Sequence, residues 1–308
     1  MNLNQKQQAI KKASWVSIIG NAILSLLKII LGLISGSLAV IADGIDSASD
    51  IVTSIITLIT ARILSKPPNK KFPYGYEKAD TIASKALSFI IFFAGAQLAI
   101  STFSNLIENE ARSMPSELAI YVTVISIIGK LGLALYQFKV GKKVNSSMLV
   151  ANARNMQNDV IISLSVLVGL IFTFIFEMPI LDIITAFAVS GWIMYVAFKI
   201  FLQSNLELMD GVEDTGVYAK IFEATKQVEG VSNPHRVRVR QISGAYLIAI
   251  DIEVDGNMSV HDSHIIAHNV EDAIKKKIEN VYDIIVHIEP KGTIDPHQPY
   301  GVSREDVT

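Results

Sequence analysis

Long apolar stretches in the first two thirds of the chain constrain its fold more than any other feature of the sequence. A helix needs about 20 mostly apolar residues to cross the hydrocarbon core of a membrane. Six segments approach this length, and they cover approximately residues 14–34, 38–63, 81–105, 116–138, 147–176 and 180–203. Half of all residues are hydrophobic and the mean hydropathy is +0.40. The sequence therefore predicts an α-helical membrane domain of six transmembrane helices.

A change of composition near residue 206 divides the chain in two, because the residues after it have the polar content of a soluble protein. We expect a cytosolic N-terminal arm over 1–13, a transmembrane domain over 14–205, a soluble cytosolic domain over 206–290 and a C-terminal tail over 291–308. The first apolar run begins near Trp15 and lacks a small-residue cleavage site, so it predicts a retained span rather than a signal peptide.

Basic residues alternate from one connection to the next. The N-terminal arm and the connections after the second and fourth spans are rich in Lys and Arg, whereas the other connections hold only Arg112 among acidic residues. Lys and Arg favour the cytoplasmic side of a membrane. We therefore expect a multi-pass protein of the cytoplasmic (inner) membrane with both termini in the cytoplasm. The net charge of −2 gives no indication of a nucleic-acid partner.

Acidic residues inside two of the spans are the strongest functional signal. Asp43, Asp46 and Asp50 share one face of the second span, because their spacings are three and four. In the fifth span, Asn155 lies four residues before Asp159. An ionised Asp at the centre of a helix costs about 2.5–3.5 kcal/mol on insertion scales, so such residues need a partner, water or a cation.

The depth of these residues favours one shared site. At about 1.5 Å per residue, the pair in the second span and the pair in the fifth reach similar levels in a core roughly 30 Å thick. We therefore expect a cage of three carboxylates and one amide oxygen that holds a cation, formed by Asp46, Asp50, Asn155 and Asp159. Asp43 lies nearer the outer interface, and we expect it to support these ligands or to line the exit path.

Three lysines also fall within the spans. Lys28 and Lys85 lie towards span ends, and we expect their side chains to extend to the interface. Lys130 lies deeper in the fourth span, and the sequence assigns it no role.

Helix and strand patterns alternate after residue 211. Period-two alternation and β-branched residues predict strands over 236–241, 246–254 and 284–288, while apolar periodicity predicts helices over 217–228 and 263–279. The order α-β-β-α-β predicts a small α+β ferredoxin-like domain, in which one helical layer covers one sheet.

All six histidines lie in this domain or its tail, and the chain contains no cysteine. Imidazole and carboxylate ligands suit zinc and similar borderline metals. One metal-capable group begins the second helix and contains His261, His264 and His268. A second group on the last strand contains His287 and Glu289, and His235 and Asp251 are expected to join it. The alternative is that the helical histidines form a solvated face.

The chain resembles the cation diffusion facilitator family over nearly its whole length. The most specific stretch is Ala42–Asp50, with the sequence Ala-Asp-Gly-Ile-Asp-Ser-Ala-Ser-Asp, which is similar to the family's second-span signature. Ala151–Asp159 looks like its fifth-span partner, and Gly75–Asp80 resembles the loop before the third span. The resemblance implies a homodimer with alternating access that exports divalent metal from the cytosol, usually by proton antiport.

The resemblance also implies the identity of the transport ligands, which are again Asp46, Asp50, Asn155 and Asp159. Zinc-selective members place His at one or both leading positions, where this chain has Asp46 and Asn155. An all-oxygen site favours harder ions. Manganese is therefore the favoured substrate, with zinc, iron and cobalt as alternatives, and no organic cofactor is expected.

Further roles implied by the resemblance lie outside the spans. The cytosolic metal site of relatives maps onto His235, Asp251, His264, His287 and Glu289. A charge interlock between membrane and soluble parts maps onto Lys78, Asp210 and Arg240. In some relatives the loop after the second span carries another metal site, but here residues 67–76 contain neither His nor carboxylate. No such site is therefore expected.

Other functions remain open on the sequence alone. The protein could be a zinc, iron or broad-specificity exporter of the same family or, in a different class, a membrane metal sensor that does not transport. The sequence contains no nucleotide-binding loop, kinase signature or Ser/His/Asp arrangement, so no enzyme is expected. The expected partners are a second copy of the chain, the lipid bilayer and protons as the coupling ion.

Overall fold

The computed structural model describes residues 3–73, 75–76, 78–107, 113–144, 146–242, 245–292 and 300–307. The chain separates into two compact units. The helical unit contains Met1–Arg62 and Ala83–Phe201, and the soluble unit contains Ile63–Ile82 and Leu202–Thr308. Each unit has its own apolar core.

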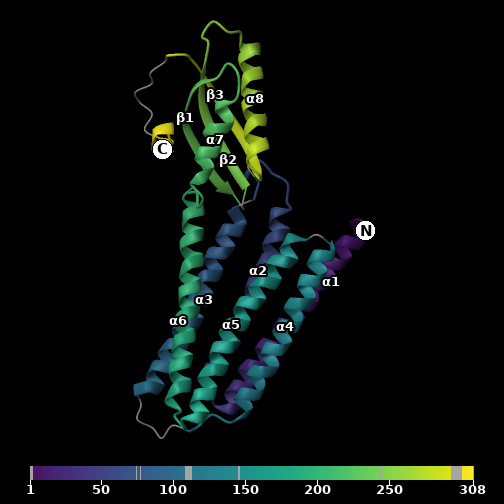
Figure 1. The fold of residues 1–308 in the computed structure, drawn as a ribbon, viewed down its shortest axis with the longest axis vertical. Helices are drawn as coiled ribbons and strands as arrows, with labels where there is room; N and C mark the ends of the chain where they lie inside the picture. The colour runs from purple at the N-terminus through teal and green to yellow at the C-terminus, as the bar shows by residue number, and fades with distance from the viewer. Residues whose placement is uncertain are drawn as a thin grey trace. The chain divides into compact units, whose positions relative to one another are not determined.

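Six long helices account for the predicted spans (Figure 1). They are α1 (Leu3–Ser35), α2 (Leu38–Leu64), α3 (Lys78–Ile107), α4 (Leu118–Val144), α5 (Ser147–Ile175) and α6 (Ile180–Leu208). In the described part of the chain, five of them are long and apolar enough to cross a membrane, namely α1, α3, α4, α5 and α6. The acid-bearing α2 falls outside that set, so its crossing remains a prediction. Because α1 begins at Leu3, the expected N-terminal arm is largely a continuation of the first helix.

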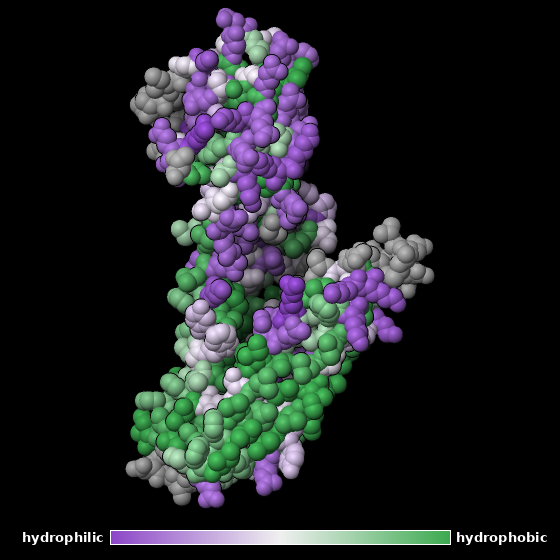
Figure 2. Space-filling model, viewed as in Figure 1, coloured by the Kyte–Doolittle hydropathy of each residue, from purple (hydrophilic) through white to green (hydrophobic). Residues whose placement is uncertain are grey.

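The helical unit presents apolar side chains on its surface. On α1, Trp15, Ile19, Ile23, Leu26 and Ile30 are all exposed, and their spacing of three and four places them on one face. Figure 2 shows apolar residues over much of the surface of these helices. A soluble protein rarely exposes such continuous apolar area, so this surface fits contact with lipid.

Glycines let the helices that carry the acids approach one another closely. A Cβ added to Gly44 of α2 would lie 3.1 Å from the backbone nitrogen of Ile29 in α1. A Cβ added to Gly32 of α1 would lie equally close to the nitrogen of Ile41 in α2. Small residues at helix crossings are typical of membrane helix packing. This crossing brings the acidic face of α2 next to α1.

The start of α2 is fixed by a carboxylate from another helix. Asp182, in the first turn of α6, accepts a hydrogen bond of 2.6 Å from the Ser37 hydroxyl and one of 2.8 Å from the Leu38 N–H. A carboxylate at a helix N-terminus satisfies orphan N–H groups and the helix dipole. The contact sets the register of α2 against α6.

The soluble unit contains α7 (Gly216–Lys226), β1 (Ser232–Ile242), β2 (Ala245–Val254), α8 (Val260–Lys277), β3 (Val281–Pro290) and the short 3₁₀ helix η1 (Arg304–Val307). Its sheet has the order β1-β2-β3, with β1 and β2 antiparallel and β2 and β3 parallel. The helices pack against each other, α7 also against β1 and α8 against β3. The order α-β-β-α-β is as predicted; a full ferredoxin-like arrangement remains a prediction.

Residues 300–307 belong to the soluble core rather than to a free tail. Val302 pairs with Val237 of β1 through two backbone hydrogen bonds, and both Val302 and Val307 contact the core. Gly301 permits this pairing, because its φ is +106° and an added Cβ would lie 2.8 Å from Arg236 backbone atoms. The C-terminal segment therefore braces β1 at Arg236.

Candidate functional site

The acidic residues of α2 lie on its packed side, as their spacing predicts. Asp43 is buried, while Asp46 and Asp50 are half-buried. On α5, Asp159 is buried and Asn155 is exposed one turn earlier. Along α2 and α5, the described chain thus offers four buried or half-buried carboxylates, three of them predicted ligands, and the exposed amide of Asn155.

Lys130 of α4 joins the acids of α2 and α5. Its ammonium nitrogen lies 3.2 Å from Asp50 Oδ2 and 2.8 Å from Asp159 Oδ2. Asp46 is close enough for its charge to interact with those of Asp159 and Lys130. Two of the four expected ligands therefore meet at one point, and Asp46 lies one helical turn before Asp50 on α2. No contact recorded among the described residues draws Asn155 into this group.

The sequence places Lys130 deep in the fourth span but does not indicate its partner. A lysine that deep in a span needs a carboxylate or a water-filled cavity, and Asp50 of α2 and Asp159 of α5 are such carboxylates. The need of a deep lysine for a carboxylate partner was the one signal in the sequence that could have linked Lys130 to these acids. Only the packing of α4 against α5 shows which acids it meets.

The structure contradicts the prediction that the Lys28 side chain extends to the membrane interface. Instead of extending to the interface, its side chain is only 1% exposed, and its nitrogen lies 2.8 Å from Asp43 Oδ2. The ammonium also donates to the hydroxyls of Ser47 and Ser163, at 3.2 and 2.9 Å. Ser163 in turn donates to Asp43 Oδ1 at 2.8 Å. Asp43 is thus bound into a network of α1, α2 and α5, where the close α1–α2 crossing keeps Lys28 away from the interface.

In the soluble unit, three predicted ligands converge on one side of the sheet. Ligand atoms of His235, Asp251 and Glu289 all lie within 4.8 Å of one another. His235 Nε2 is 3.5 Å from Glu289 Oε2, and His287 Nε2 is 3.6 Å from Glu289 Oε1. Parallel pairing places Asp251 opposite His287. We call these four residues the soluble cluster.

An irregularity in β1 brings His235 to this side. His235 pairs with Asp251 and Arg238 with Ala249, so two residues of β1 stand opposite one of β2. Arg236, inside this bulge, has a φ of +48°, which is uncommon for a residue with a long side chain. Bulges re-aim side chains, and here both His235 and Arg236 reach towards β2.

Two arginines donate hydrogen bonds to the Asp251 carboxylate, one to each oxygen. Arg236 Nη1 donates to Oδ2 at 2.5 Å and Arg238 Nη2 to Oδ1 at 3.2 Å. The Asp251 side chain is 0% exposed. A buried carboxylate requires compensation, so this aspartate serves the pairing of β1 with β2 as well as the soluble cluster. The sequence did not predict these arginines as partners, because only the bulge brings Arg236 to this side.

The histidines of α8 form a separate pair. His264 Nε2 lies 3.1 Å from His268 Nε2, and His268 Nδ1 lies 3.6 Å from Glu271 Oε2. His264 is therefore not among the residues that meet Asp251 and Glu289 in the described part of the chain. His261 is exposed on the first turn of the same helix.

Lys78, Asp210 and Arg240 do come together. Lys78 Nζ lies 2.9 Å from Asp210 Oδ1, and Arg240 Nε lies 3.9 Å from Asp210 Oδ2. All three belong to the soluble unit; Lys78 and Arg240 are exposed and Asp210 is half-buried. Ion pairs of this kind are worth about 0–1 kcal/mol each.

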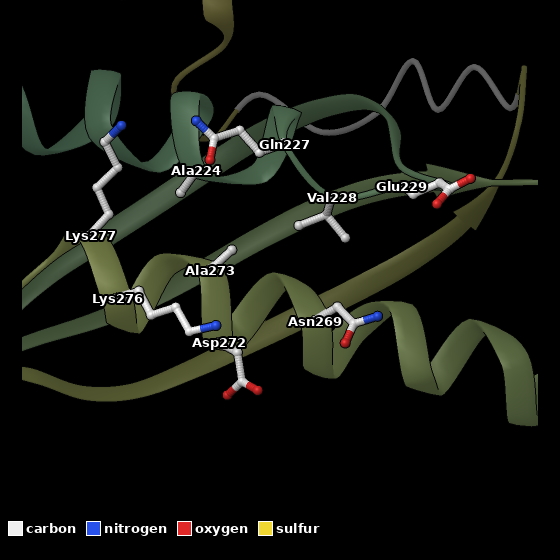
Figure 3. A pocket seen from close by; sticks show the side chains of 9 residues that line it. All are labelled: Ala224, Gln227, Val228, Glu229, Asn269, Asp272, Ala273, Lys276 and Lys277. Atoms are coloured by element: carbon white, nitrogen blue, oxygen red, sulfur yellow. The ribbon is translucent and has the colours of Figure 1, made fainter.

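The soluble unit also contains an open cavity of about 560 Å³ beside α7 and α8 (Figure 3). Its lining residues are Ala224, Gln227, Val228, Glu229, Asn269, Asp272, Ala273, Lys276 and Lys277. None of the predicted ligands lines it, so it is not the candidate metal site.

Comparison with known proteins covers both parts of the chain. A family model described as the cation efflux transmembrane domain matches residues 14–209, and one described as the cytoplasmic domain of cation efflux proteins matches residues 214–291. The manganese efflux system protein MneS of Bacillus subtilis is 30% identical, over 89% of this chain and 93% of that protein. The manganese efflux system protein MneP of the same organism is 28% identical, over 93% and 98%. Among solved structures, the metal-bound C-terminal domain of the CzcD transporter from Thermotoga maritima is 38% identical over 26% of this chain and 92% of that chain, with a TM-score of 0.25.

Proposed function

The chain belongs to the cation diffusion facilitator family and is a cation efflux transporter of the membrane rather than an enzyme; from this premise we propose that it exports divalent manganese in exchange for protons. Zinc, iron and cobalt are the alternative substrates. The ion is bound during transport by Asp46, Asp50, Asn155 and Asp159.

One observation carries the assignment of this site. Carboxylates from two different helices, Asp50 of α2 and Asp159 of α5, lie against one ammonium group in the helical unit. Carboxylates that meet in this way within membrane-spanning helices mark an ion pathway. Because they belong to separate helices, a relative movement of α2 and α5 would change the ligand geometry and so release the ion.

The ligand chemistry supports manganese. The four proposed ligands offer oxygen only, and oxygen ligands suit Mn²⁺, whereas imidazole and thiolate suit zinc. Two relatives, MneS and MneP, are named as manganese efflux proteins. Zinc would bind more tightly by intrinsic order, so selection would rest on ligand type, geometry and availability of the metal.

Proton coupling follows from the chemistry of the same ligands. Carboxylates must be deprotonated before they bind a cation, so the less acidic side of the membrane loads metal and the more acidic side releases it. The distribution of Lys and Arg supports a cytoplasmic location of both termini. Loading would then take place from the cytoplasm. The matched cytoplasmic-domain model supports a homodimer assembled through the soluble unit.

The test uses purified protein in sealed vesicles of known orientation, with a fluorescent Mn²⁺ reporter and an imposed pH step. We expect Mn²⁺ to move towards the acidic side at a rate that rises with the size of the step. Flux that ignores the pH step would contradict antiport but keep transport, and absence of any flux would favour the sensor alternative.

A further inference from the structure

Lys130 is more buried than the two carboxylates that it joins. Its side chain is 3% exposed, compared with 12% for Asp159 and 30% for Asp50. The ammonium group is therefore better shielded from solvent than the two carboxylates, which keep some exposed surface. Each carboxylate contacts Lys130 through Oδ2, which leaves both Oδ1 atoms free of this ion pair.

We call Asp46, Asp50, Asp159 and Lys130 the transport cluster, and their charges match an ion of one particular valence. Asp46, Asp50 and Asp159 carry three negative charges when ionised, and Lys130 offsets one of them. A divalent cation then makes the cluster neutral, whereas a trivalent cation leaves a positive excess. In a medium of low dielectric constant, an uncompensated charge is costly. The lysine therefore changes the valence that the three carboxylates favour.

The second buried lysine of the helical unit shows a different arrangement. Lys28 is paired with a single carboxylate, Asp43, and is also bonded to the hydroxyls of Ser47 and Ser163. That ion pair is neutral by itself, because one positive charge faces one negative charge. Lys130, by contrast, contacts two carboxylates that are both proposed ligands. The two lysines thus form a natural contrast between a structural pair and a site residue.

Resting on the proposed function, we infer that Lys130 is a resident counter-ion of the transport site, which makes the site select a divalent rather than a trivalent cation and limits how tightly it holds the ion. Lys130 does not bind the substrate. It positions Asp50 and Asp159, and its positive charge offsets one of the three negative charges. The site therefore holds the ion less tightly, so that the ion can leave as well as enter.

The experiment measures equilibrium binding of Mn²⁺ and La³⁺ to the purified full-length protein, together with Mn²⁺ flux. His235→Ala and His287→Ala are present throughout to silence the soluble cluster. Lys130→Gln keeps a hydrogen-bond donor without charge, Lys130→Met removes both, and Lys130→Arg keeps the charge. The matched control is the double variant Lys28→Met with Asp43→Asn, which removes a neutral pair.

We expect Lys130→Gln and Lys130→Met to bind Mn²⁺ at least about tenfold more tightly, because a nearby positive charge has gone. We also expect a rise in the ratio of La³⁺ to Mn²⁺ affinity and a fall in both KM and kcat for flux. Lys130→Arg should keep the wild-type affinity ratio. The control pair should lower thermal stability without changing that ratio. If Lys130→Met does not fold, Lys130→Gln decides the result.

Weaker or unchanged Mn²⁺ binding in the neutral variants, or an unchanged La³⁺ to Mn²⁺ ratio, would overturn the inference and leave Lys130 as a structural residue. Asp159→Ala separates this failure from failure of the proposed site. If Asp159→Ala abolishes Mn²⁺ binding while the Lys130 variants behave like wild type, only the counter-ion role is wrong. If Asp159→Ala binds Mn²⁺ normally, the site itself is wrong.

Discussion

In the helical unit, Lys130 reaches two carboxylates from a helix that carries none of the proposed ligands. In the soluble unit, Arg236 and Arg238 reach one carboxylate from the neighbouring strand of the same sheet. The Asp50 and Asp159 side chains keep some exposure, whereas Asp251 has none. Asp50 and Asp159 therefore keep surface for an incoming ion, whereas both oxygens of Asp251 are bonded to arginines.

This difference shows that a carboxylate beside a basic group is not by itself a metal ligand. The exposure and bonding of its oxygens decide whether it can accept an ion. Asp251 is fully buried and bonded on both oxygens, so its removal would leave two arginines without their partner. Removal of Asp50 or Asp159 would leave Lys130 with one remaining partner. We therefore expect the same kind of substitution to damage transport in one unit and stability in the other.

The largest expected effect is on transport. Asp50→Ala or Asp159→Ala should reduce Mn²⁺ flux by at least about 100-fold, because a change even in the groups that support metal ligands costs 10–100-fold. Folding should persist, since Lys130 keeps one carboxylate. Flux in proteoliposomes and the elution volume of the purified dimer are the two measurements. Normal flux in either variant would remove that residue from the site.

For the soluble unit we expect Asp251→Ala to destabilise the isolated fragment 206–308 by about 3 kcal/mol, since breaking a buried ion pair costs about 3–5 kcal/mol and Arg238 is partly exposed. Urea unfolding gives the free energy. Asp272→Ala on the exposed side of α8 is the control. A small loss in Asp251→Ala would show that the arginines are dispensable for the fold. The fragment should extend to 308, because Val302 and Val307 contact its core.

Zinc binding by this fragment tests which histidines act. His235→Ala combined with His287→Ala should weaken zinc binding at least about tenfold, because both imidazoles lie at Glu289. The matched variant is His264→Ala with His268→Ala, which removes the helical pair instead. Isothermal titration compares the two. A larger loss in the helical variant would assign zinc to α8.

Selectivity of the membrane site should respond more modestly. Asn155→His should raise zinc flux relative to manganese flux several-fold, because imidazole is a softer ligand than an amide oxygen. Asp46→His should act in the same direction. The measurement is competitive uptake with both ions present. An unchanged ratio in both variants would place selectivity elsewhere.

The smallest expected effect concerns pH and Glu253. The Asn233 amide, which donates a side-chain hydrogen bond, and the Gly292 N–H together hold the pKa of this buried carboxyl below its ordinary value. A carboxyl with a depressed folded-state pKa adds stability above its unfolded pKa and loses it as the pH falls through the folded value. Glu253→Gln should therefore lower the stability of the fragment at pH 7 by about 1 kcal/mol and reduce its loss on acidification. Exposed Glu279→Gln should change neither.

Much of the architecture was determined by the sequence alone. Apolar runs of about 20 residues have few folded solutions other than membrane-spanning helices, and five of the six predicted spans meet the criteria of length and composition among the described residues. The order of the soluble elements followed from their periodicity. The acids of α2 were placed on one helical face by spacing alone, because a helix fixes which residues are neighbours within about two turns.

Only the tertiary structure decided how these residues are partnered. The sequence predicted that Lys28 extends to the interface, and it assigned no role to Lys130. In the structure, the packing of α1, α2, α4 and α5 buries both lysines against carboxylates. In the soluble unit the bulge at Arg236 decided that two arginines meet Asp251, while His264 pairs along its own helix. Partners far apart in the chain depend on where whole elements pack, and a local pattern carries no information on that. The charge of the transport cluster, with its built-in lysine, is therefore a property of the fold.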